Sequence, residues 1–91
     1  MRESTIEKEI CKFAKEHGCL TWKNAGPNAR GTPDRIFVKD GKVLFLEIKA
    51  PGKRPTLLQE RWLRKILEQN VPTGWTDSVS GGISLLREHL L

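Results

Sequence analysis

The sequence has few of the residues that build disulfide or zinc scaffolds. Its 91 residues include two cysteines and two histidines. Neither Cys11 nor Cys19 belongs to a Cys-x-x-Cys motif, so a structural zinc site is not expected. Cys11 falls on the apolar side of a helical pattern, which argues against a catalytic Cys–His pair. Both thiols are interpreted as reduced core residues.

Long hydrophobic runs, repeats and low-complexity segments are also absent. No apolar stretch approaches the roughly 20 residues that a membrane-spanning helix needs. Charged residues interrupt the first ten positions, so no signal peptide is recognised. Gly52-Lys53 lacks the spacing of a phosphate-cradling P-loop. These absences predict a cytoplasmic protein without a membrane partner.

What is present is an ordinary globular composition with an uneven charge. The length of 91 residues predicts a single domain over residues 1–91. Hydrophobic residues make up 37% of the chain and charged residues 30%, which is typical of a folded protein rather than a disordered one. The formal net charge is +5, and between residues 23 and 65 eleven Lys or Arg stand against four Asp or Glu. A positive centre of this kind favours a polyanionic partner such as DNA or RNA.

The strongest local signal is a β-hairpin around Asp40-Gly41, two residues that tolerate the positive φ angles of a type I′ turn. Counting outward from this turn places Asp34 directly opposite Glu47, with Cβ atoms about 4.5–5.5 Å apart. Opposed carboxylates repel unless a cation lies between them, and strand alternation puts Lys49 on the same face as Glu47. Two oxygen ligands beside a fixed positive charge are typical of metal-dependent phosphodiesterases.

The remaining patterns predict three helices and four strands. A capping box at 4–7 should open a helix that runs to about His17, and a second box at 56–59 should open a helix to about Asn70. The sequence also indicates a mobile, substrate-facing loop at 24–33 and a final helix after residues 80–82. Strands are expected at 19–23, 34–39, 42–49 and 73–79. The second helix should bury Leu58, Trp62, Leu63, Ile66 and Leu67.

This order of elements resembles the core of the PD-(D/E)XK nucleases, with Asp34 as the first acid and Glu47-Ile48-Lys49 as the (D/E)XK motif. The longer pattern, from Gly31-Thr32-Pro33-Asp34 to Glu47-Ile48-Lys49-Ala50-Pro51 and then Gln59, is similar to the VRR-NUC family of virus-type replication-repair nucleases. The resemblance covers nearly the whole chain. It implies an α/β fold of order α-β-β-β-α-β-α, with a mixed four-stranded sheet flanked by helices.

The resemblance also implies roles for individual residues. Mg²⁺ or Mn²⁺ would be held by Asp34, Glu47, the Ile48 carbonyl and Glu7, while Lys49 would orient the attacking water and Gln59 would support the site. Capping alone also explains Glu7 and Gln59. Residues expected to bind nucleic acid are Lys23, Asn24, Arg30, Lys53 and Arg54.

The implied activity is hydrolysis of phosphodiester bonds by a structure-specific DNA endonuclease. The expected substrate is branched DNA such as four-way (Holliday) junctions, cut by a homodimer in a bacterial or phage-infected cell. Flap, single-strand or restriction-like cleavage by the same fold remains an alternative. So does a non-catalytic nucleic-acid-binding module in which Asp34 and Glu47 are only structural. A protein-interaction module would leave the basic surroundings of the acidic pair unexplained.

Overall fold

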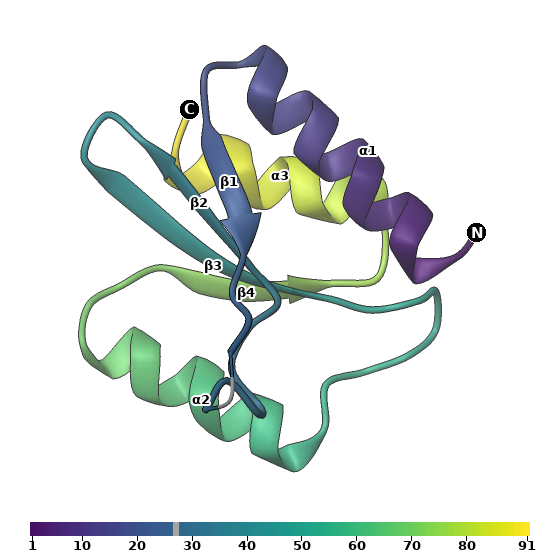
Figure 1. The fold of residues 1–91 in the computed structure, drawn as a ribbon, viewed down its shortest axis with the longest axis vertical. Coiled ribbons are helices and arrows are strands. Elements are labelled where there is room, and N and C mark those ends of the chain that lie inside the picture. The colour runs from purple at the N-terminus through teal and green to yellow at the C-terminus, as the bar shows by residue number, and fades with distance from the viewer. Residues whose placement is uncertain (27) are drawn as a thin grey trace.

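A computed structural model describes residues 1–26 and 28–91. Pro27, within the predicted 24–33 loop, lies outside the described residues. Figure 1 shows a twisted sheet with helices packed on both of its sides. The predicted order α-β-β-β-α-β-α is confirmed: α1 Glu3–Glu16, β1 Leu20–Lys23, β2 Arg35–Lys39, β3 Lys42–Ile48, α2 Leu57–Glu68, β4 Thr73–Thr76 and α3 Val79–His89. Over the described residues, none of these helices has the length and hydropathy of a membrane span.

The described strands form one mixed sheet of order β1-β2-β3-β4. The β1–β2 and β2–β3 pairs are antiparallel, whereas β3 and β4 run parallel because α2 carries the chain back between them. Asp40 (φ 50°) and Gly41 (φ 79°) supply the turn between β2 and β3. Lys39 pairs with Lys42 and Arg35 with Leu46, so the predicted hairpin register is confirmed.

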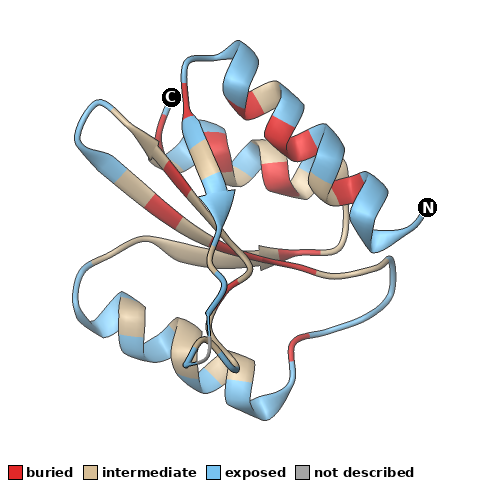
Figure 2. Ribbon diagram, viewed as in Figure 1, coloured by how far each residue is buried: buried red, intermediate tan, exposed pale blue. Residues whose placement is uncertain are grey.

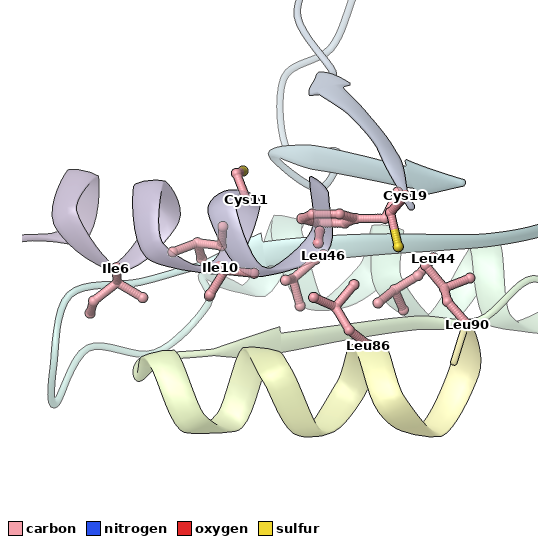
Figure 3. Close-up of a cluster of buried hydrophobic side chains, with 11 residues drawn as sticks. Ile6, Ile10, Cys11, Cys19, Leu44, Leu46, Leu86 and Leu90 are labelled. Atoms are coloured by element: carbon pink, nitrogen blue, oxygen red, sulfur yellow. The ribbon is translucent and has the colours of Figure 1, made fainter. Parts of the chain in front are cut away.

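The hydrophobic core lies between the sheet and the pair α1 and α3. Figure 3 shows Ile6 and Ile10 on the side of α1 that faces α3, and Leu86 of α3 beside Leu46 and Leu44 of β3. In Figure 2 most of the buried positions follow this same layer. Both cysteines are buried and unpaired, as predicted. The core residues are Ile6, Ile10, Cys11, Ala14, Cys19, Phe37, Leu44, Leu46, Ile48, Leu86 and Leu90.

The opposite face of the sheet is covered less completely by α2. All residues of α2 are described, and none is fully buried; Leu58 is 38% exposed and Leu67 57%. The predicted buried stripe is therefore wrong, although the helix is amphipathic. The reason is its position: among the strands, α2 packs chiefly against β4, the edge of the sheet. Its other neighbour is the loop before β2, where Gly31 lies against Leu58 and Trp62.

The ends of several elements differ from the sequence prediction. The capping box at 4–7 is wrong, since α1 begins at Glu3 and its N-cap Arg2 makes no side-chain capping bond within the described residues. The first strand begins at Leu20 rather than residue 19. The box at 56–59 is confirmed: Thr56 Oγ1 accepts from the Gln59 amide at 3.2 Å.

The last strand ends, and the last helix begins, earlier in the chain than predicted. β4 ends at Thr76, not at residue 79, because Ser78 caps α3 by accepting a bond from the Gly81 amide at 3.0 Å. Gly81 and Gly82 are therefore helical rather than a turn before the helix. A Cβ on Gly82 would collide with Ile10, so this glycine serves the close packing of α3 on α1.

Candidate active site at the open end of the hairpin

The two predicted acids lie where β2 begins and β3 ends. One step beyond the last registered pair, Arg35 with Leu46, the strands bring Asp34 opposite Glu47. The Asp34 side chain is fixed by the backbone of the facing strand, because its Oδ2 accepts a hydrogen bond from the Ile48 amide at 3.1 Å. Parallel pairing with β4 sets Glu47 beside Trp75. A hydrogen bond within the hairpin thus orients Asp34, and pairing with the neighbouring strand β4 fixes the position of Glu47.

Glu47 is the buried member of the pair, with 1% of its surface exposed. Its Oε2 lies 3.1 Å from the Lys49 ammonium, as strand alternation predicts. Its Oε1 has no hydrogen-bond partner among the described residues. An unpartnered buried carboxylate oxygen is costly, and it marks a position where a further positive or donor group fits.

The surroundings of Glu47 change its acidity. Burial, reinforced by the nearby Asp34 carboxylate, raises the pKa of Glu47 to about 7 from 4.5, and Lys49 offsets only part of that rise. The 3.1 Å contact with Lys49 pulls the other way, toward an ionised carboxylate. Burial is the larger of the two influences, since the side chain is almost wholly removed from water.

Glu7, the third predicted acidic ligand, is paired with Arg35 instead. Its Oε2 lies 3.1 Å from Arg35 Nη1, in an ion pair that is mostly shielded from water. Arg35 also donates to Thr21 Oγ1 at 3.3 Å. Among the described residues, no three His, Cys, Asp or Glu side chains are close enough together to hold a metal ion. Asp34 and Glu47 are thus brought together, while Glu7 is held aside by Arg35.

Comparisons with known proteins agree with this geometry. No protein-family model matches the chain. A phage protein, "Putative nuclease p44" of Acyrthosiphon pisum secondary endosymbiont phage 1, is 40% identical over 62 residues, which cover 67% of each chain. The chain belongs to the family of this phage protein. A solved structure described as "VRR_NUC domain" has a TM-score of 0.83 and 20% identity, over 93% of this chain and 94% of that chain. The fold is therefore the VRR-NUC fold, as the sequence motifs predicted.

Within this VRR-NUC fold, Gln59 occupies its capping position. Its Oε1 accepts a hydrogen bond from the Thr56 amide at 2.8 Å. The same box holds the start of α2, where the chain leaves the loop that follows β3. Its predicted support of the active site remains a prediction beside this observed capping contact.

The predicted nucleic-acid ligands lie on three segments of the VRR-NUC fold. Lys23 ends β1 and is exposed, as is Arg30 in the loop before β2. The Asn24 amide donates to Thr32 Oγ1 at 3.1 Å and to the Pro33 carbonyl at 3.0 Å, so this side chain holds the loop together. The remaining two, Lys53 and Arg54, are exposed in the loop after β3.

That last loop is attached to β4 and the segment after it at two points. The Gly52 amide donates to Asp77 Oδ2 at 3.0 Å. The Arg54 guanidinium lies over the Trp75 ring, 5.4 Å from its centroid, in a cation–π contact. Trp75 in turn neighbours Glu47 across the parallel pair. These contacts hold the basic loop beside the buried carboxylate.

Sequence reasoning missed Arg35 and Asp77. A signal for Arg35 existed, since alternation from Phe37 puts it on the inner face of β2, where a charged residue requires a partner. Asp77 had no comparable signal. Its contact with Gly52 joins segments 25 residues apart in the chain.

The residues present fit a divalent cation. Asp34 and Glu47 supply hard oxygen ligands, and the unpartnered Glu47 Oε1 is the atom that such an ion would satisfy. Burial is the main cause of the raised pKa of Glu47, and a cation there would offset the smaller contribution from the repulsion of Asp34.

Proposed function

We propose that this chain is a metal-dependent endonuclease that hydrolyses phosphodiester bonds in DNA. The observation that carries the proposal is the buried Glu47, opposed to Asp34, ion-paired with Lys49 at 3.1 Å and left with one unpartnered oxygen. A purely structural carboxylate pair would have both oxygens satisfied. The description of the 40% identical phage protein as a putative nuclease supports the same chemistry.

The metal would be Mg²⁺ or Mn²⁺, held by Asp34, Glu47 and the Ile48 carbonyl. When bound, such an ion lowers the pKa of its water and stabilises negative charge on the phosphate. Glu7 joins the ligand set only by leaving Arg35, to which it is now paired at 3.1 Å. The Ile48 amide, donating to Asp34, keeps one carboxylate oriented throughout.

Lys49 contributes through its positive charge. Its ammonium lies against Glu47 and its own backbone is fixed by a hydrogen bond from its amide to the Thr76 carbonyl at 2.9 Å. A cation held so rigidly orients the attacking water and stabilises the charge that develops at phosphorus, without reorganisation during the reaction. Gln59 supports the site from α2.

The proposed substrate is branched DNA, with four-way junctions as the preferred form. A single site cuts one strand, so paired cuts require a C2 homodimer that presents two symmetric sites. The basic residues near the site, Lys23, Arg30, Lys53 and Arg54, together with Asn24, would contact the DNA.

The test is cleavage of a labelled four-way junction with Mg²⁺, with Mn²⁺ and with EDTA. Wild type is compared with Glu47→Ala and Lys49→Ala, and with Lys42→Ala as a control, since Lys42 is exposed at the far end of the same strand. We expect metal-dependent, paired symmetric cuts, lost by a factor of about 100 or more in both site variants and kept in the control.

The other outcomes separate the alternatives. Binding of the junction without cleavage under either metal would replace the enzyme by a nucleic-acid-binding module. Cleavage of flaps or single strands alone would keep the chemistry and exclude the junction as substrate. Single cuts by a monomeric protein would exclude the homodimer.

A further inference from the structure

A groove outside the carboxylate site runs between α1 and the β1 edge of the sheet. In Figure 1 these two elements lie side by side, and Figure 2 shows the outer side of α1 as largely exposed. The groove has a volume of about 690 Å³, within the size range of known ligand sites. Its lining is Ser4, Glu7, Lys8, Cys11, Lys12, Lys15, Glu16, Lys23 and Arg35.

The lining is strongly basic. Five Lys or Arg side chains face two Glu side chains, and one of those acids, Glu7, is already paired with Arg35. Lys8, Lys12 and Lys15 are exposed and form no ion pair within residues 1–26 and 28–91. Their spacing of four and three residues puts them in one row along α1.

Such a row destabilises the helix, because like charges at this spacing cost about 0.2–0.5 kcal/mol per pair. The spacing of the three lysines instead matches the phosphate spacing of a nucleic-acid strand. The helical rise of about 1.5 Å per residue spreads the three lysines over about 10 Å. One DNA strand places about three phosphates in that length, at about 3.4 Å each.

One end of the groove lies at the same end of the sheet as the proposed active site. Lys23 and Arg35 are paired across β1 and β2 at the end of the sheet, and Arg35 directly follows Asp34 in the chain. The Arg35 side chain faces α1, where it pairs with Glu7, whereas alternation along β3 puts Glu47 on the face opposite the core residues Leu46 and Ile48. DNA in the groove would therefore pass around this end of the sheet to reach the carboxylates.

We propose that the α1–β1 groove binds the phosphate backbone of one DNA strand, on the arm that flanks the cut, through Lys8, Lys12, Lys15 and Lys23. This inference rests on the proposed nuclease function and assigns to its substrate a path across the molecule. The contacts are to phosphates, so they add affinity without sequence preference.

The experiment measures the affinity for a labelled four-way junction in EDTA at several KCl concentrations. The triple variant Lys8→Gln, Lys12→Gln, Lys15→Gln is compared with the control triple Lys42→Gln, Arg61→Gln, Arg64→Gln. The control removes the same charge from exposed positions outside the groove. We expect the groove variant to bind about 10- to 100-fold more weakly, with a salt slope smaller by about 2 to 3. The control should keep most of the wild-type affinity.

A second variant separates charge from folding. Lys8→Arg, Lys12→Arg, Lys15→Arg keeps the charges and should keep the salt slope, while circular dichroism and thermal melting verify the fold of each protein. Equal losses in the groove and control triples, or an unchanged slope in the groove triple, would overturn the inference. Because binding is measured without metal, failure of cleavage by a wild-type protein that binds through the groove would count against the nuclease alone.

Discussion

Glu47 holds an ionisable group in surroundings that disfavour its charged form. Its carboxyl group is buried in the sheet with one oxygen unpartnered, and its pKa is raised to about 7. Replacing both members of a buried ion pair by apolar groups often stabilises a protein, because desolvation outweighs the attraction between the charges. Retaining it is consistent with the proposed use of Glu47 in binding a cation rather than in holding the fold.

The raised pKa makes the stability of the metal-free protein depend on pH. A carboxyl group that binds its proton more tightly in the folded state stabilises fully below pH 4.5, and this contribution is lost as the pH rises through about 7. In EDTA we therefore expect the melting temperature of wild type to decrease, relative to that of Glu47→Gln, as the pH is raised from 5 to 8.

Two comparisons make this measurement specific. Glu9→Gln changes an exposed carboxylate on α1 and should leave the pH profile of wild type unchanged. Mg²⁺ should raise the melting temperature of wild type more at pH 8 than at pH 5, since the ligand must be deprotonated to bind. Parallel profiles for wild type and Glu47→Gln would contradict the assigned pKa shift.

At the scale of single elements, the central hairpin was the most predictable part. Asp40-Gly41 fixes a turn with two positive φ angles. Counting from this turn gives the cross-strand partner of each hairpin residue, and the period of two along a strand gives the face on which its side chain lies, out to Asp34 and Glu47. Both the register and the acidic pair follow from residues close together in the chain, which is why the sequence alone indicates them.

Element ends and helix burial were less predictable because they depend on tertiary partners. Ser4 and Glu7 form a capping pattern, yet Glu7 pairs with Arg35, a residue 28 positions away. Gly81 and Gly82 suggest a turn, yet they lie in α3. The apolar stripe of α2 predicts burial only if a full layer lies beneath it, and among the strands this helix rests chiefly on β4.

Gly31 offers a test of how the loop before β2 is held against α2. Its φ is +82°, and a Cβ there would lie 2.5 Å from Leu58 Cγ and 3.0 Å from Trp62 Cδ1. Gly52 is a matched control, with φ +81° and no atom within 4 Å among the described residues. Gly31→Ala should destabilise the protein by about 1–3 kcal/mol more than Gly52→Ala, because overpacking adds to the shared backbone strain. Chemical denaturation of both variants measures the difference, and equal losses would show that α2 does not restrain the loop.

On the scale of the whole molecule, the two sides of the sheet are unequal. The side with α1 and α3 contains all the hydrophobic core residues, whereas none of the described residues of α2 is fully buried. Most of the free energy of burial therefore belongs to one layer. Asp34 and Glu47, at the end of the hairpin, are fixed by β3 and β4 rather than by α2.

This inequality should make the protein open in two separate steps under native conditions. Backbone amides of α2 should exchange with deuterium through local opening at a fraction of the global unfolding free energy, while those of α1, α3 and β3 should need global unfolding. Exchange rates measured residue by residue at increasing denaturant concentration would distinguish amides that exchange by local opening from those that need global unfolding. A single opening free energy shared by α2 and the core elements would contradict the prediction. Opening of α2 would then leave the carboxylates in place, because their contacts come from β3 and β4.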